Sequence, residues 1–583
     1  MGSATRPRRL RRLGTVVLLV AVALALGLTA SRGGAAVKSG GTWQNMANPP
    51  SFNPGAMYLL TDGTVMVYDQ GQCNCGSGKW WKLTPDSKGS YVDGTWSQAA
   101  SLSYAGLYWG SAVLPDGRLI VEGADWIGGT EVWGNQGSIY DPVANTWTAI
   151  SPPDDGAGNW SRIGDAPSVV LPSGRFMVGA SGYSGTKDEA ILDASNLTWT
   201  TTGDGKADGN GEEGFTLLPN GRVLAVQAKP QSCSTQGSEL YNPSTGSWTS
   251  AGLTPQPLVD CTNGEIGPQI LMHDGKVFVE GSTPNTALYD VAAGTWSAGP
   301  EFPVIGGKQY DVADGPGVLL PDGNVLVGAS PGNHLPSEHF FLFDGTKLTQ
   351  IADNTNWTAN QTSDSYMLML PTGQVLFTNR LGTMDVYTDA GTPNAAWAPT
   401  VGSVSSTLAA GGTYTVSGTQ LNGLSETGAF GDDYNPSTDY PLVRITNTVT
   451  GHVVYARTSG MSNRSIAPGA SSSTKFTLPS GIQDGASQLR VVANGIASAP
   501  ASVTVSGGTP LPKPVACIVP KLKGKSLSAA RSALTKAHCR LGKVTKKFSS
   551  SAKKGRVISQ KPSPGKHLAK GAKVAVAVSK GKK

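Results

Sequence analysis

A short pattern of apolar and turn-forming residues recurs along the chain. Residues 112–123, AVLPDGRLIVEG, have the pattern of an apolar strand, a tight turn and a second apolar strand. In most copies Pro takes the first turn position, a small polar residue follows, and Gly takes the position that needs a positive φ. The turn glycines are Gly63, Gly117, Gly174, Gly221, Gly275, Gly323 and Gly373. The pattern predicts seven copies of one β-hairpin.

The spacing of the copies indicates the architecture. The turn glycines lie 47 to 57 residues apart, and kelch-type propeller blades repeat about every 50 residues. After most hairpins come a Tyr-Asp or Tyr-Asn strand and a Thr-Trp or Ser-Trp strand, as at Tyr140 and Trp147. We therefore predict a seven-bladed kelch-type β-propeller over residues 38–397. Either the strand at Trp43 or the strand at Trp397 is expected to close the ring.

The pattern changes on both sides of the repeats. Residues 1–35 hold an Arg-rich start, an apolar run and small residues, which is typical of a secretory signal peptide. The alternative is an uncleaved anchor, but the apolar run is shorter than the ~20 residues of a spanning helix. Residues 398–507 show short alternating strands without the turn motif, which predicts an immunoglobulin-like sandwich. Residues 508–514 have the composition of a linker.

Residues 515–583 contain the one clear helical pattern. Ser526 or Ser528 can cap a run whose alanines and Leu534 fall on one face, and short strands follow. We expect a small α+β module there. The fold class is thus mainly β: a propeller, a sandwich and this module.

Charge is divided sharply between the body and the tail. Residues 511–583 hold 20 Lys and Arg and no Asp or Glu, whereas residues 33–510 hold 20 basic and 40 acidic residues. A cationic tail on an exported protein favours anionic cell-wall polymers over nucleic acid as partners. The expected location is secreted and cell-wall associated, with no membrane attachment once the signal is cleaved.

The six cysteines fit an oxidising compartment. An even number in an exported chain predicts three disulfides, with Cys233 and Cys261 flanking one repeat and a possible pair in the tail module. The C-x-C of Cys73 and Cys75 has a metal-binding pair as its alternative. The tail pair would be Cys517 and Cys539.

The order of leader, seven kelch-like blades and sandwich resembles galactose oxidase and its bacterial relatives. The stretch GDDYNPSTDYPLVRI, residues 431–445, is typical of the third domain there. The tail is similar to a PASTA domain, with IVPKLKGKSLSAARSALTKAHCRLGKV and VISQKPSPGKHLAKGAKVAVAVS. PASTA modules occur in penicillin-binding proteins and wall-sensing kinases, so the resemblance implies muropeptide or peptidoglycan as a partner.

The galactose oxidase resemblance implies a site of copper, two tyrosines, two histidines and a cysteine crosslinked to one tyrosine under a tryptophan. Tyr108 matches the crosslinked tyrosine and Trp126 the stacking tryptophan, so these are the candidate catalytic residues if the chain is an enzyme. The other positions depart: Asn53 replaces the cysteine, Ser363 and Asp364 replace a Tyr-His pair, and the last histidine falls near Ser459. These oxygen donors hold Cu(II) poorly and cannot house a tyrosyl radical, which disfavours copper.

The same positions predict a different site. Nine residues before the turn glycines stand four acids, at the start of the innermost strand of each blade, where they would ring the channel mouth. Like charges there repel unless something positive lies among them. We expect the ring to bind a cation such as Ca²⁺, an amine or a polyhydroxyl ligand. The ring is Asp165, Glu212, Asp314 and Asp364.

Two classes of function follow. The first is a carbohydrate-binding, wall-associated protein that has lost copper-radical chemistry, with a glycan at the propeller. The second is an enzyme, either a galactose or glyoxal oxidase with a rearranged site or a hydrolase that uses paired acids of the ring. We favour the first, since fold does not fix activity.

Overall fold

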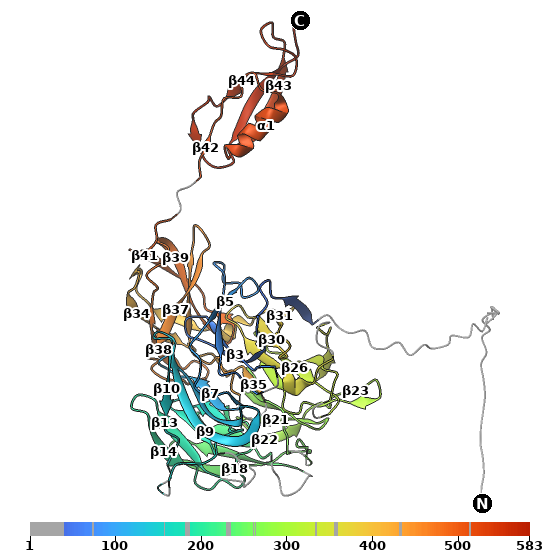
Figure 1. Cartoon of the computed structure of the whole chain (residues 1–583), viewed down its shortest axis with the longest axis vertical. Helices are drawn as coiled ribbons and strands as arrows, with labels where there is room; N and C mark the ends of the chain where they lie inside the picture. Colours follow the sequence, from blue (N-terminus) through green and yellow to red (C-terminus); the bar gives the residue numbers. More distant parts are fainter. Residues whose placement is uncertain are drawn as a thin grey trace, which may run out of the picture.

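The computed structural model describes residues 40–72, 75–154, 156, 158–180, 187–228, 235–260, 262, 264–332, 335–354, 359–430, 434–511 and 515–583. The expected leader (residues 1–35), residues 512–514 of the linker, and Cys73, Cys233 and Cys261 lie outside this part. Figure 1 shows that the described body is built of strands, with one short helix near the C-terminus. Within the described ranges no helix is long and apolar enough to cross a membrane.

Seven antiparallel sheets follow one another along the chain, and each is a propeller blade. Blade 1 is β2 (Pro54–Leu59), β3 (Val65–Asp69), β4 (Trp80–Thr84) and β5 (Thr95–Gln98). Blade 2 is β6 (Gly106–Leu107), β7 (Gly110–Val113), β8 (Leu119–Ile127), β9 (Thr130–Asp141) and β10 (Thr146–Ile150). Blade 3 is β11 (Ser168–Val170), β12 (Phe176–Gly179), β13 (Glu189–Asp193) and β14 (Thr198–Thr202). Blades 4 and 5 are β15 (Thr216–Leu217), β16 (Val223–Val226), β17 (Gly237–Asn242) and β18 (Ser247–Leu253); and β19 (Gln269–Leu271), β20 (Lys276–Glu280), β21 (Thr286–Asp290) and β22 (Thr295–Ala298).

The last two blades each recruit a strand from elsewhere in the chain. Blade 6 is β25 (Pro316–Leu319), β26 (Val325–Ala329), β27 (His339–Phe343) and β28 (Leu348–Gln350), joined by β35 (Gly428–Phe430); blade 7 is β29 (Tyr366–Met369), β30 (Val375–Thr378), β31 (Met384–Asp389) and β1 (Gly41–Asn45). A two-stranded hairpin of β23 (Val304–Ile305) and β24 (Lys308–Gln309) precedes blade 6.

The N-terminal strand closes the ring. β1 pairs antiparallel with β31, and Trp43 stands opposite Tyr387. Of the two strands that the sequence offered for closure, the one at Trp43 is therefore used. Trp397 lies in the short 3₁₀ helix η2 (Ala395–Trp397), and its ring stacks on His273 at 4.2 Å.

The repeat glycines and tryptophans explain why the blades form. All seven turn glycines have φ between 76° and 96°, a region that other residues enter only with strain. The indole nitrogens of outer strands donate across the gap to the preceding blade, as from Trp147 to Ala100 O at 2.9 Å and from Trp199 to Ser151 O at 2.8 Å. These outer tryptophans thus tie neighbouring blades together.

The sandwich packs against the end of the propeller where the hairpin turns lie. Backbone N–H groups of Thr458 and Arg464 donate to Thr61 O (3.1 Å) and Pro172 O (3.0 Å), next to the turns of blades 1 and 3. Its strands are β32 (Thr400–Ser403), β33 (Thr407–Ala409), β34 (Thr413–Thr419), β36 (Leu442–Asn447), β37 (Val453–Ser459), β38 (Ser471–Thr477), β39 (Gly485–Ala493), β40 (Ile496–Ala497) and β41 (Ala501–Ser506).

A segment of the sandwich, residues 424–441, enters the channel of the propeller; residues 431–433 of it lie outside the described part. Its strand β35 pairs with β25, the innermost strand of blade 6. The Tyr434 hydroxyl accepts from Met57 N at 2.7 Å and donates to Met57 O in blade 1, and Glu426 accepts from Leu217 N at 2.9 Å in blade 4. The segment therefore satisfies backbone groups of inner strands that face the axis.

The C-terminal module is the small α+β unit that the sequence predicts. It consists of β42 (Cys517–Ile518), α1 (Leu527–Lys536), β43 (Arg540–Lys547), β44 (Val557–Lys561), β45 (His567–Leu568) and β46 (Lys573–Ser579). Ser526 caps α1 by accepting from Ala529 N at 3.2 Å. In Figure 1 the module stands beyond the sandwich, on the side away from the propeller.

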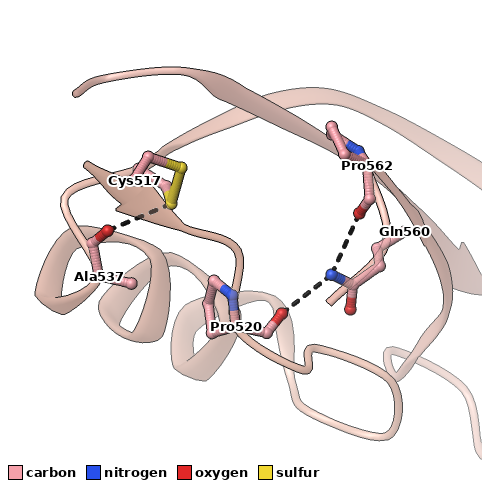
Figure 2. The surroundings of a disulfide bond; sticks show 6 residues. Cys517, Pro520, Ala537, Gln560 and Pro562 are labelled. Carbon is pink, nitrogen blue, oxygen red and sulfur yellow. Dashed lines mark hydrogen bonds between the residues drawn. A yellow bond between two sulfur atoms is a disulfide. The ribbon is translucent and has the colours of Figure 1, made fainter. Parts of the chain in front are cut away.

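The predicted Cys517–Cys539 disulfide is confirmed and links β42 to the chain that follows α1 (Figure 2). Beside it, the Gln560 amide donates to Pro520 O at 2.9 Å and so ties β44 to the loop after β42. Cys75 is also disulfide-bonded, which makes its thiol unavailable to a metal. Both bonds agree with an oxidising compartment.

Candidate functional site

The mouth of the channel lies at the end of the propeller opposite the sandwich. The position nine residues before each turn glycine precedes the innermost strand, whereas the sandwich covers the turn end of those strands. Backbone bonds join these positions between blades: Asp165 N donates to Tyr108 O at 3.4 Å, and Asp314 N donates to Ile266 O at 3.3 Å. Equivalent residues of successive blades are therefore neighbours at the mouth.

Four of these positions share an unusual backbone conformation. Tyr108, Asp165, Glu212 and Asp314 have φ of 56°, 50°, 62° and 51°. Non-glycine residues adopt a left-handed φ in only a few per cent of cases, so its repetition in four blades reflects the turn that the chain must make into each inner strand. This conformation fixes where the side chains leave the backbone.

Asp364 is paired with a cation that belongs to the chain itself. It lies in the 3₁₀ helix η1 (Thr362–Asp364), and its carboxylate forms an ion pair with the guanidinium of Arg380. The other guanidinium nitrogen lies 3.5 Å from the Tyr108 hydroxyl. The positive charge for which the sequence suggested a bound ion is thus supplied, at Asp364, by an arginine from the loop after β30.

Sequence reasoning missed Arg380, and one signal for it existed. Arg380 follows the turn glycine Gly373 by seven residues. In each blade the innermost strand begins, and the second strand ends, at the same end of the blade. The same count from the turn would have placed Arg380 at the mouth. The predicted ring included only acids, and its counter-charge was expected from a bound ligand.

A second internal cation pairs with the residue that follows Glu212 in the chain. The Lys206 ammonium is 2.8 Å from Glu213 and 3.4 Å from Glu239, and both its own side chain and that of Glu213 are fully buried. Burial lowers the pKa of Lys206, but Glu213 and Glu239 outweigh this effect and hold it above its usual value. The ammonium also lies 5.0 Å from the ring of Trp248 on the outer strand β18, so this ion pair is buried within the outer part of blade 4 and neutralises Glu213 rather than the ring acid Glu212.

The described residues form no metal site. Among the described residues, which include all four acids of the predicted ring, no group of three or more His, Cys, Asp and Glu side chains can hold a metal ion. The Asn53 amide donates to Gly71 O at 2.8 Å. The donors at the mouth are therefore an amide, a phenol and carboxylates, one of which already pairs with Arg380, a set that does not fit copper.

The two candidate catalytic residues lie close together in blade 2, with Tyr108 directly after β6 and Trp126 in β8. Trp126 in β8 stands one register position from Tyr108, because it pairs with Leu107 in β6. Tyr108 lines a small cavity below the mouth together with four other aromatic side chains. These are Tyr68, Trp109, Tyr366 and Tyr434.

The contribution of the sandwich differs from the expected one. Ser459, expected near the site, lies at the end of β37, where its carbonyl accepts from Thr474 Oγ1 at 3.2 Å. The residue of the sandwich that reaches the cavity is Tyr434, whose ring lies 5.6 Å from that of Tyr366. The expectation for Ser459 was wrong because the channel segment leaves the sandwich before β36.

Comparisons with known proteins agree with part of this description. Residues 518–580 match the family model of the PASTA domain, which confirms the PASTA assignment of the tail. Among solved structures, the chain is similar to "Novel fungal alcohol oxidase with catalytic diversity among the AA5 family, in complex with copper", at 17% identity and a TM-score of 0.45, over 80% of this chain and 100% of the other. It is also similar to "Structure of YjhT", at 14% identity and a TM-score of 0.36, over 53% of this chain and 99% of the other. No curated protein matches the chain.

Proposed function

We propose that this chain is a secreted, cell-wall-associated, carbohydrate-binding protein: the PASTA module holds it on the wall, and the propeller presents a glycan-binding face. The observation that carries the proposal is the PASTA match over residues 518–580, in a tail with 20 Lys and Arg and no acid. Such a module is suited to peptidoglycan or to an anionic wall polymer, with an attraction that salt screens.

The exposed edge of the module supports contact with a polyanion. β43 lies at the edge of its sheet, and its lysines Lys543, Lys546 and Lys547 are exposed. Phe548 follows at 55% exposure, and the ammonium of Lys580 lies 5.2 Å from its ring centroid. Positive charge and one accessible aromatic ring therefore gather along one edge.

The propeller is proposed to have lost copper-radical chemistry. Asn53 cannot form the thioether crosslink of the galactose oxidase family. The guanidinium of Arg380 already neutralises the carboxylate of Asp364. The rings around Tyr108 and Trp126 suit stacking on sugars in a binding protein as well as in an enzyme.

Sedimentation with purified cell walls tests the proposal. The full chain should pellet with walls at about 50 mM NaCl and be released at about 0.5 M, since the shorter Debye length screens the lysines. A variant with Lys546, Lys547 and Lys580 changed to Gln should bind about fivefold more weakly or worse. The matched control changes Lys82, Lys88 and Lys347 of the propeller to Gln and should pellet as the parent does. Equal pelleting with and without residues 511–583 would refute the role of the module.

A further inference from the structure

A groove of about 590 Å³ opens on the mouth end of the propeller, away from the channel axis. It lies between blade 1 and the loop after β30 of blade 7, the same loop that carries Arg380. Its lining includes Phe52, Asn53, Asp69, Gln72, Lys79 and Trp81, with Gly382 on the blade 7 side. This volume falls in the range of about 300 to 1,000 Å³ that is usual for small-molecule sites.

One wall of the groove is a rigid aromatic stack. The rings of Phe52 and Trp81 lie 5.0 Å apart and are inclined by 4°. Trp96 meets Phe52 edge-on at 5.2 Å, and its own indole nitrogen donates to Asn48 O at 2.9 Å. Three rings from three segments therefore hold the wall in one orientation, which reduces the entropy lost when a ligand binds.

The polar groups of the groove are held by the backbone. The Asn53 amide donates to Gly71 O at 2.8 Å, and Asp69 Oδ1 accepts from Gly71 N at 3.1 Å. Because Asn53 Nδ2 is used in this way, its Oδ1 is directed toward blade 7, where a Cβ on Gly382 would lie 3.7 Å from it. Gly382 has a φ of 74°, which other residues adopt only with strain.

We infer that this groove binds a pyranose ring of a β-linked glycan. A pyranose has a face of C–H groups that suits an aromatic wall, and equatorial hydroxyls that pair with carboxylate, amide and ammonium groups at its edge. The groove has this combination in Trp81 with Asp69, Asn53 and Lys79. The inference rests on the proposed wall association, since glycan is then the polymer that surrounds the propeller.

Titration with soluble sugars tests the site. Tetra-N-acetylchitotetraose and cellotetraose share the β-linked pyranose backbone and differ in the N-acetyl group, so the two arms tell whether that group is read. At least one of them should bind the full chain by calorimetry and shift its tryptophan emission. Trp81→Ala should weaken binding about tenfold, and Trp81→Phe should stay within about threefold of the parent because a ring remains.

Exposed residues keep the test valid if Trp81→Ala fails to fold. Lys79→Ala changes an exposed side chain that lines the groove and should weaken binding about threefold. Trp199→Ala, on the outer strand of blade 3, is the matched control and should bind as the parent does. The inference fails if neither sugar binds, or if Trp81→Ala and Lys79→Ala bind normally. Pelleting with walls in the same preparation shows whether the proposed function survives that failure.

Discussion

Arg464→Met tests whether the sandwich and the propeller unfold as one unit. Arg464 is 1% exposed and forms an ion pair with the buried Asp439 of the channel segment. Its other guanidinium nitrogen donates to Val113 O at 2.9 Å in blade 2, and its charge lies 5.1 Å from the ring of Tyr440. The one side chain therefore contacts the sandwich, the channel segment and a propeller blade.

The size of the effect follows from the charge that is left behind. Removing one partner of a buried ion pair costs about 3 to 5 kcal/mol, because the other charge stays buried without compensation. Glu426 lies in the same cluster: burial and then Asp439 raise its pKa to about 8, an increase that Arg464 opposes. Without Arg464, the pKa of Glu426 in the folded state should rise further.

Urea unfolding of the full chain at two pH values measures this effect. A carboxyl group whose pKa is raised by folding destabilises the protein above its unfolded pKa, so the loss in Arg464→Met should be largest near pH 7 and shrink as the pH falls toward about 4. Adding Asp439→Asn should restore at least half of the loss, since it removes the uncompensated charge. Lys347→Met, at an exposed pair, should change the stability by about 0.5 kcal/mol or less. A loss under about 1 kcal/mol, or one independent of pH, would refute the argument.

Two further predictions concern buried acids and copper. Burial holds the pKa of Glu280 well above its usual value, so the folded chain loses stability relative to the unfolded one as the pH rises above about 4.5. The change in melting temperature caused by Glu280→Gln should therefore be more stabilising at pH 8 than at pH 4.5. An equal change at both pH values would contradict this. After copper is added to the full chain and the sample is dialysed, elemental analysis should find well below one copper ion per chain. The reason is that Arg380 pairs with Asp364 and that an amide, not a thiol, stands at Asn53. One retained ion per chain would overturn the proposed loss of the copper site.

The blades were predictable from sequence because their determinants are local. A turn that needs a positive φ, such as the one at Gly117, leaves its mark within four residues, and apolar strands flank it directly. The pairing of Trp43 with Tyr387 joins positions more than 340 residues apart, and nothing in either strand identifies the other. Local patterns could therefore supply two candidates for ring closure but not choose between them.

The site was less predictable because it depends on side chains from different blades. The offset from the turn glycines correctly made Tyr108 and Asp165 neighbours in the backbone. It could not show that Arg380 turns back onto Asp364, nor that residues 424–441 leave the sandwich and enter the channel. Both facts depend on packing between elements, which leaves no periodic mark in the sequence.

The two ends of the propeller serve different purposes, and this follows from the order of the chain. The sandwich occupies the turn end of the inner strands, and the chain leaves it from β41 toward the module that is proposed to bind the wall. The mouth, with Arg380 and the aromatic groove, lies at the opposite end of those strands. A molecule held through its module can therefore keep the groove accessible to glycan, so attachment and sugar binding should respond to separate substitutions. The lysine variant of the module and Trp81→Ala test this independence, because each should weaken one property and leave the other intact.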